Sequence, residues 1–187
     1  DRNRISMHST LLGAHINNIR NLMIVTGDPV PSGDRGNTKG VFDFNSIRFM
    51  EYVKELNQDV FLQDSFSYGG ALNQNQANTD KVIERMQRKI DAGVSWFMTQ
   101  PIYSDEEVEK LARMKRELDT KILCGIMPLV SYRNAMFIKN EMPGIHVPDE
   151  IVEQYRPDMS RAEAEAVAVD ISLEVIDKLK DVADGFY

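Results

Sequence analysis

Residues 83–118, IERMQRKIDAGVSWFMTQPIYSDEEVEKLARMKREL, decide the fold. Apolar residues at helical spacing open this stretch, and the helix that they predict stops at Gly93. The next run, VSWFMTQP, is short and largely apolar, which predicts a strand. Ser104 and Glu107 then have the spacing of a capping box, which predicts the start of a second helix. The stretch therefore predicts a helix, a strand and a helix joined by short links.

The same alternation extends in both directions along the chain. Alternating helices and short apolar strands indicate parallel strands joined by crossover helices, in a sheet buried on both faces. Asn45 or Ser46 is a candidate N-cap for one helix, and Ser160 with Glu163 forms a second capping box. The expected strands lie near 22–27, 60–66, 95–100, 121–127 and 183–187, and the expected helices near 5–16, 46–56, 78–93, 104–118, 132–140, 149–156 and 161–180.

The composition predicts one globular domain, residues 1–187, and limits its partners. The chain has 187 residues and a formal net charge of −7. Binding to nucleic acid or to an anionic membrane needs clustered basic residues, so neither partner is expected. The only cysteine, Cys124, rules out an internal disulfide and favours a reducing, cytoplasmic location. The three histidines are scattered along the chain, so no metal site is predicted.

The links that follow the strands are longer and more polar than the links that precede them. In parallel α/β proteins, ligands bind in the loops at the carboxyl ends of the strands. The stretch IVTGDPVPSGDRG, residues 24–36, runs from a strand into such a loop and places Asp28 there. Asp28 is either a turn carboxylate or a charge beside a ligand. Gln100, at another strand end, can bind an amide-bearing heterocycle or a loop backbone.

Other polar residues have two interpretations as well. Arg88 and Lys89 lie late in a helix, where charges are usually solvated or complement the helix dipole. Tyr132 can stack on an aromatic ligand, although exposed tyrosines are common. The sequence contains neither the glycine-rich dinucleotide fingerprint nor a P-loop motif. Reasoning from the residues alone therefore ends at a parallel α/β protein with a polar ligand face.

The order of five motifs carries the interpretation further. They are IRNLMIVTGDPVP, VFDFNSIRFM, GGALNQNQAN, IERMQRKIDAGVSWFMTQPIY and GIMPLVSYRNAMFIKNEMPGIHVPDEI. In this order the chain resembles methylenetetrahydrofolate reductase over essentially its whole length, and most closely the reductase half of proteins that also carry a homocysteine methyltransferase. The resemblance implies a (β/α)8 TIM barrel that reduces 5,10-methylenetetrahydrofolate to 5-methyltetrahydrofolate. It also implies FAD as cofactor, NADH or NADPH as hydride donor, and a role in methionine biosynthesis.

The resemblance also implies roles for individual residues. Asp28 matches an aspartate beside the flavin and the folate, where a negative charge favours a cationic folate intermediate. Asn73 stands where many members of the family have a histidine, and Thr26 where they often have an arginine. The implied cofactor-binding residues are Thr26, Gly27, Asp28, Phe42, Asp43, Asn73, Arg88 and Lys89, and the implied substrate-binding residues are Gln100, Tyr132 and Asn134.

The match to the family begins after its third strand, so we expect a barrel that lacks about three strands here. The glutamate that acts as general acid in the family would then lie outside the chain. We expect these 187 residues to be inactive alone, to pair as a homo-oligomer, and to be joined in the parent to a homocysteine methyltransferase domain. Two alternatives stay open: a non-catalytic barrel remnant that mediates domain or subunit association, and a different barrel enzyme acting on a phosphorylated substrate.

Overall fold

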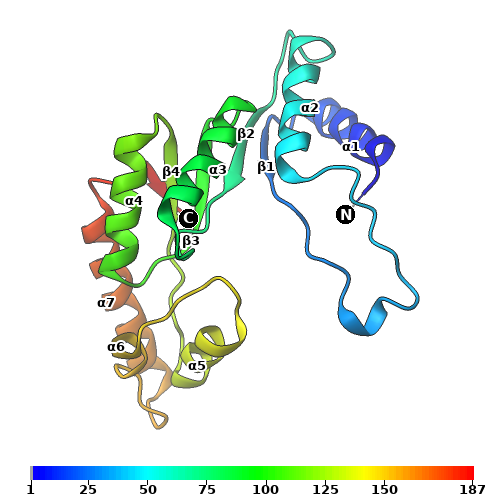
Figure 1. The fold of residues 1–187 in the computed structure, drawn as a ribbon. Helices are drawn as coiled ribbons and strands as arrows, with labels where there is room; N and C mark the ends of the chain where they lie inside the picture. Colours follow the sequence, from blue (N-terminus) through cyan, green and yellow to red (C-terminus); the bar gives the residue numbers. More distant parts are fainter. Residues whose placement is uncertain (1) are drawn as a thin grey trace. The chain divides into compact units, whose positions relative to one another are not determined.

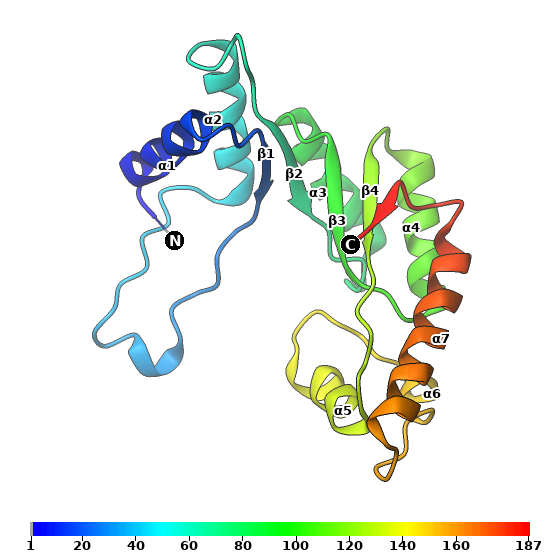
Figure 2. The ribbon, with the colours of Figure 1, turned by 180° about the vertical axis from the view of Figure 1, so that it is seen from behind.

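The computed structural model describes residues 2–187 (Figures 1 and 2). They fall into two compact units, one formed by the chain up to Ala71 with Gln87–Ser95, and the other by Leu72–Met86 with Trp96–Tyr187. The strands are β1 (Asn21–Ile24), β2 (Ser67–Ala71), β3 (Trp96–Pro101), β4 (Lys121–Gly125) and β5 (Gly185–Phe186). The helices are α1 (Arg4–Ile16), the 3-10 helix η1 (Ser32–Asp34), α2 (Ser46–Gln58), α3 (Thr79–Asp91), α4 (Asp105–Glu117), α5 (Tyr132–Glu141), α6 (Asp149–Val152) and α7 (Arg161–Leu179).

In the first unit, β1 and β2 pair in parallel, from Asn21 opposite Ser67 to Ile24 opposite Gly70. Helix α2 begins where the Asn45 side chain accepts a hydrogen bond from the Arg48 backbone, which confirms one of the two predicted caps. One face of α2 is buried, and its buried residues are Phe49, Met50, Tyr52, Val53 and Leu56. This apolar face is the helical stripe that the sequence predicts over 46–56.

The strand expected at 60–66 is wrong, because these residues form turns and β2 begins only at Ser67. The Asn57 side chain pairs with both backbone polar groups of Phe66, at 2.9 Å to its N–H and 2.8 Å to its carbonyl. Phe61 and Phe66 are buried, and their rings lie 5.0 Å apart, edge to face. The apolar residues of this segment therefore form the core of a turn, while the strand itself, SYGGA, is rich in glycine, which strands disfavour.

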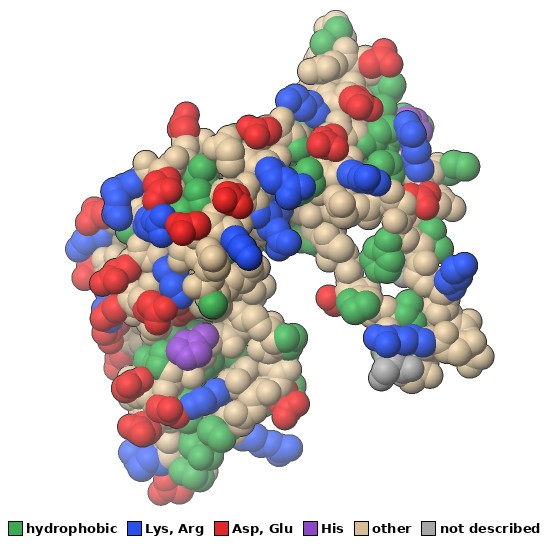
Figure 3. Space-filling view, viewed as in Figure 1, with side chains coloured by type: hydrophobic (Ala, Val, Ile, Leu, Met, Phe, Trp, Pro, Cys, Tyr) green, Lys and Arg blue, Asp and Glu red, His purple; other side chains and the backbone are tan. Residues whose placement is uncertain are grey.

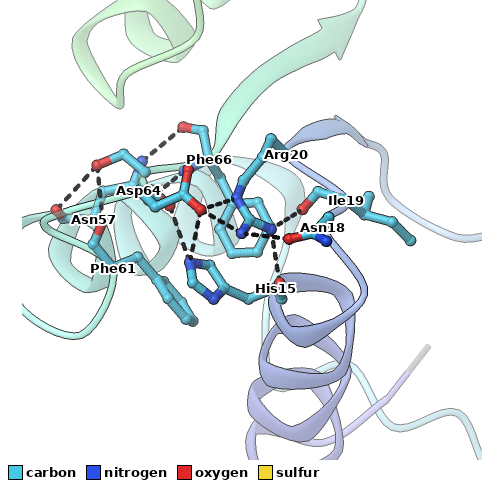
Figure 4. A network of polar contacts seen from close by, with 9 residues as sticks. His15, Asn18, Ile19, Arg20, Asn57, Phe61, Asp64 and Phe66 are labelled. Atoms are coloured by element: carbon cyan, nitrogen blue, oxygen red, sulfur yellow. Dashed lines mark hydrogen bonds and ion pairs between the residues drawn. The ribbon is translucent and has the colours of Figure 1, made fainter.

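A polar network joins this turn to the end of α1 (Figure 4). The Asp64 carboxylate accepts a hydrogen bond from Arg20 Nε at 2.6 Å, and the Arg20 guanidinium lowers the pKa of Asp64. His15 Nε2 lies 3.0 Å from the Asp64 carbonyl oxygen, and the His15 ring stacks on Phe61. These contacts fix the chain immediately before β1 and immediately before β2.

In the second unit, β3, β4 and β5 are parallel neighbours, with Phe97 opposite Ile122 and Leu123 opposite Gly185. Helices α4 and α7 pack together, as Figures 1 and 2 both show. Both predicted capping boxes, at the start of α4 and of α7, are confirmed. The thiol of Cys124 on β4 is fully buried, and this burial raises its pKa to about 12.

The predicted α/β class with parallel strands is confirmed within each unit. Several boundaries differ from expectation. Three strands are shorter: β1 ends at Ile24, β4 ends at Gly125, and β5 covers only Gly185–Phe186. The helix expected over 149–156 is the single turn Asp149–Val152. The barrel and the single domain stay predictions.

Among residues 2–187, no helix combines the length and apolar character that crossing a membrane requires. On the face drawn in Figure 3, acidic and basic side chains are interspersed.

Candidate functional site

The link from β1 to α2, residues 25–45, contains only the short helix η1 and is mostly exposed. Thr26 Oγ1 accepts a hydrogen bond from the Ser46 backbone at 3.3 Å, so the start of α2 holds the start of this loop. Thr26, Gly27 and Phe42 line one small pocket of about 40 Å³. Asp28 follows Gly27 directly in the chain, and it is exposed to solvent. The structure thus brings three of the predicted cofactor residues together at the carboxyl end of β1.

Asp43 has a structural contact in the same loop. Its Oδ2 accepts a hydrogen bond from the Arg4 backbone at 2.8 Å, in the first turn of α1, where backbone N–H groups lack helical partners. Its neighbour Phe42 pairs with Arg2 in a short parallel bridge. These two contacts attach the far end of the loop to the start of α1, and Phe42 remains half exposed.

Arg88 and Lys89 are neighbours in α3 but lie in different surroundings. Lys89 is only 7% exposed, and its Nζ donates a hydrogen bond to the carbonyl of Ala71 at 2.6 Å. Ala71 is the last residue of β2, so the ammonium group lies at the carboxyl end of that strand. Arg88 is exposed and lines a groove beside α2, together with Glu51 and Glu55. Successive helical residues point about 100° apart, which explains the separation.

Asn73 lies in the loop after β2. Its Oδ1 accepts a hydrogen bond from the Asn75 backbone at 2.9 Å, and the Asn75 side chain donates to the Gly144 carbonyl. Gly144 has a φ of +86°, and a Cβ there would lie 3.0 Å from the Asn73 amide nitrogen. Asn73 therefore packs closely against a glycine that follows α5.

Gln100 lies near the end of β3, where its backbone is held by the buried side chain of Gln74. Gln74 is fully buried and comes from the same loop as Asn73. The structure thus joins the loop after β2 to the predicted substrate residue at the end of β3.

Tyr132 and Asn134 lie at the start of α5, after β4. Asn134 Oδ1 accepts a hydrogen bond from the Val130 backbone at 3.2 Å, and its own N–H donates to Ser131 Oγ, the N-cap. Tyr132 lines a pocket that it shares with two basic side chains, Arg133 and Arg156. Asn134 therefore shapes the turn, while Tyr132 faces an open pocket.

A family model described as methylenetetrahydrofolate reductase matches residues 1–186. The chain belongs to the methylenetetrahydrofolate reductase family. The resemblance inferred from the five motifs is confirmed at this level, and the relationship to the bifunctional methyltransferase proteins stays a prediction. A comparison with curated proteins finds no match.

Membership in the methylenetetrahydrofolate reductase family indicates an oxidoreductase that acts on methylenetetrahydrofolate, and this family has a fold of the TIM-barrel type. The sites named above are those that its motifs imply. Gln74 was not among them, although it lies in the motif GGALNQNQAN. A side-chain amide that pairs with a distant backbone has no sequence periodicity, so only the folded structure reveals it.

Proposed function

We propose that this chain forms part of a (β/α)8 methylenetetrahydrofolate reductase that uses FAD and NADH or NADPH to produce 5-methyltetrahydrofolate. The observation that carries the proposal is the position of Lys89, whose ammonium group lies at the carboxyl end of β2. Ligands of parallel α/β proteins bind at this end of the strands. The family match supplies the substrate class.

The residues present fit FAD through their chemistry. FAD carries a pyrophosphate, and a lysine ammonium with three donors is a common phosphate ligand. The pocket of Thr26, Gly27 and Phe42 adds a small hydroxyl residue, a glycine and an aromatic ring at the end of β1. Bound FAD would supply hydride transfer between NAD(P)H and the folate. We propose that Lys89 holds a phosphate group and that the β1 loop contacts the rest of the cofactor.

Asp28 and Gln100 would act on the folate. An ionised Asp28 favours positive charge nearby, so it would stabilise the cationic iminium form of methylenetetrahydrofolate that accepts hydride. This stabilisation is larger once the bound ligands exclude water, because the local dielectric constant then falls. The carboxamide of Gln100 can donate and accept hydrogen bonds at the same time, which suits the amide edge of a pterin. Tyr132 and Asn134 would complete the substrate side.

The cellular location, the pathway and the partners that we propose follow the resemblance to the family. We place the protein in the cytoplasm and in one-carbon metabolism, as a homo-oligomer that supplies 5-methyltetrahydrofolate for methionine synthesis. A fused homocysteine methyltransferase domain would consume this product directly.

The test is FAD titration of the protein that carries this chain, followed by visible absorption. Lys89→Ala should weaken FAD binding by about 1–3 kcal/mol, the value of one charge-assisted hydrogen bond. Lys81→Ala is the matched control, because Lys81 is an exposed lysine of the same helix and is not among the implied cofactor residues.

Equal FAD affinity for the unmodified protein and Lys89→Ala would contradict the assignment of Lys89. A protein that binds no flavin at all would favour the non-catalytic alternative instead.

A further inference from the structure

The pairing of β3 with β4 contains a β-bulge that includes Gln100. Met98 lies opposite Leu123, but the next pair is Pro101 with Gly125, so β3 has one residue more than β4 between them. A bulge of this kind bends a strand and changes the direction of a side chain, and bulges are frequent beside active sites. Thr99 and Gln100 are the residues within it.

Side chains satisfy backbone polar groups on both sides of the bulge. Thr99 Oγ1 accepts a hydrogen bond from the Gly125 backbone at 3.0 Å. Gln74 Oε1 accepts from the Gln100 N–H at 3.1 Å, and Gln74 Nε2 donates to the Gln100 carbonyl at 3.1 Å. One carboxamide thus pairs with both backbone polar groups of Gln100, as a neighbouring strand would.

Glu107 fixes the orientation of this carboxamide. Gln74 Nε2 donates a hydrogen bond to Glu107 Oε1 at 3.0 Å, and both side chains are buried, at 0% and 2% exposure. A carboxylate only accepts hydrogen bonds, so the nitrogen of Gln74 must face Glu107. The other oxygen of Glu107 accepts from the backbones of Tyr103 and Ser104, which anchors it to the start of α4. The chain of contacts runs from α4 through Glu107 and Gln74 to Gln100.

We infer that Gln74 is a positioning residue for the folate. Gln74 holds the bulged backbone of Gln100, and this sets the direction in which the Gln100 side chain points. This inference rests on the proposed function, in which Gln100 binds the substrate. Glu107 acts one step further away by orienting Gln74. Neither residue touches the reacting atoms in this assignment.

The first test replaces Gln74 by methionine, which keeps similar volume and removes the hydrogen bonds. In the full protein that carries this chain, Gln74→Met should raise the KM for methylenetetrahydrofolate about tenfold, as expected when hydrogen bonds that hold a binding group are lost. FAD affinity should not change, because no cofactor residue is altered. Gln76→Met is the control, since Gln76 is exposed in the same loop. An unchanged folate KM in Gln74→Met would overturn the inference.

A second variant separates positioning from mere stability. The double substitution Gln74→Glu with Glu107→Gln reverses the polarity of the buried contact and can keep a hydrogen bond between the two side chains. A carboxylate at position 74 cannot donate to the Gln100 carbonyl, however. We expect the free energy of unfolding to recover relative to Gln74→Glu alone, while the folate KM stays high. If KM recovers together with stability, the network is only structural and the inference is wrong.

Hydrogen exchange separates failure of this inference from failure of the proposed function. The Gln100 amide should exchange slowly in the unmodified protein and faster in Gln74→Met. Equal exchange in both proteins would overturn the positioning contact, whatever the activity. If the full protein that carries this chain shows the expected exchange but does not reduce methylenetetrahydrofolate, the proposed function is wrong, and substrate positioning with it.

Discussion

At the scale of the residue, Gly93 shows how one position can control the link between a helix and a strand. Its φ is +98°, a conformation that side chains rarely adopt, and a Cβ there would lie 2.1 Å from the hydroxyl of Tyr68. Tyr68 cannot easily retreat, because it is buried and its hydroxyl donates to the Ala92 carbonyl at 2.8 Å. The sequence identified Gly93 as a helix stop, and the contact with Tyr68 adds a second reason for glycine.

Replacing Gly93 by alanine should therefore lower the free energy of unfolding. Backbone strain alone accounts for about 1–3 kcal/mol, and the clash with Tyr68 adds to it. Gly36→Ala is the control, because nothing lies within 4 Å of its Cβ position. Urea denaturation of the two variants measures the difference. Similar stability of both would show that Tyr68 and the turn adapt freely.

At the scale of the element, helix ends are better determined by sequence than strand positions. The capping boxes of α4 and α7 lie where the sequence predicts them, because each depends on two residues three positions apart. The strand expected at 60–66 failed because its apolar side chains pack into a turn held by Asn57. A short apolar run can be buried in a strand or in a turn, and the sequence alone does not distinguish these two structures.

Helix α7 offers a matched pair of serines for testing the cap. Ser160 Oγ accepts a hydrogen bond from the Glu163 backbone, whereas Ser172 lies inside the helix and donates to the Ala168 carbonyl. Ser160→Ala should lower the free energy of unfolding by about 1 kcal/mol. Ser172→Ala should leave it unchanged or raise it, because alanine is the better helix former. Thermal unfolding of both variants measures the difference. If both substitutions change the stability by the same amount, the Ser160 cap does not stabilise the helix.

At the scale of the whole molecule, order along the chain is more informative than any single motif. Alternation predicted parallel strands, and the order of five motifs predicted the family, both of which are confirmed. The candidate site was only partly predictable. Lys89 and Arg88 look equivalent in sequence, and only the fold directs Lys89 to the end of β2.

The long loop at residues 25–45 gives a prediction at this scale. Its only helix is the short η1, and long loops with so little regular structure are uncommon in compact domains and often bind ligands. If the loop contacts FAD, adding FAD should slow hydrogen exchange across 25–45 and leave α7, which carries no proposed cofactor residue, unaffected. Mass spectrometry of the exchanged peptides measures both regions. Unchanged exchange in the loop at saturating FAD would exclude it from the cofactor site.

The buried thiol on β4 has a practical consequence. Cys124 is the only cysteine in the chain, and a thiol with a raised pKa reacts slowly because the thiolate is the nucleophile. An alkylating reagent can therefore modify the native protein only when β4 becomes exposed. Under excess reagent, the rate of modification then approaches the rate at which the strand opens. The rate of Cys124 modification thus measures how often the β3–β4–β5 sheet opens transiently.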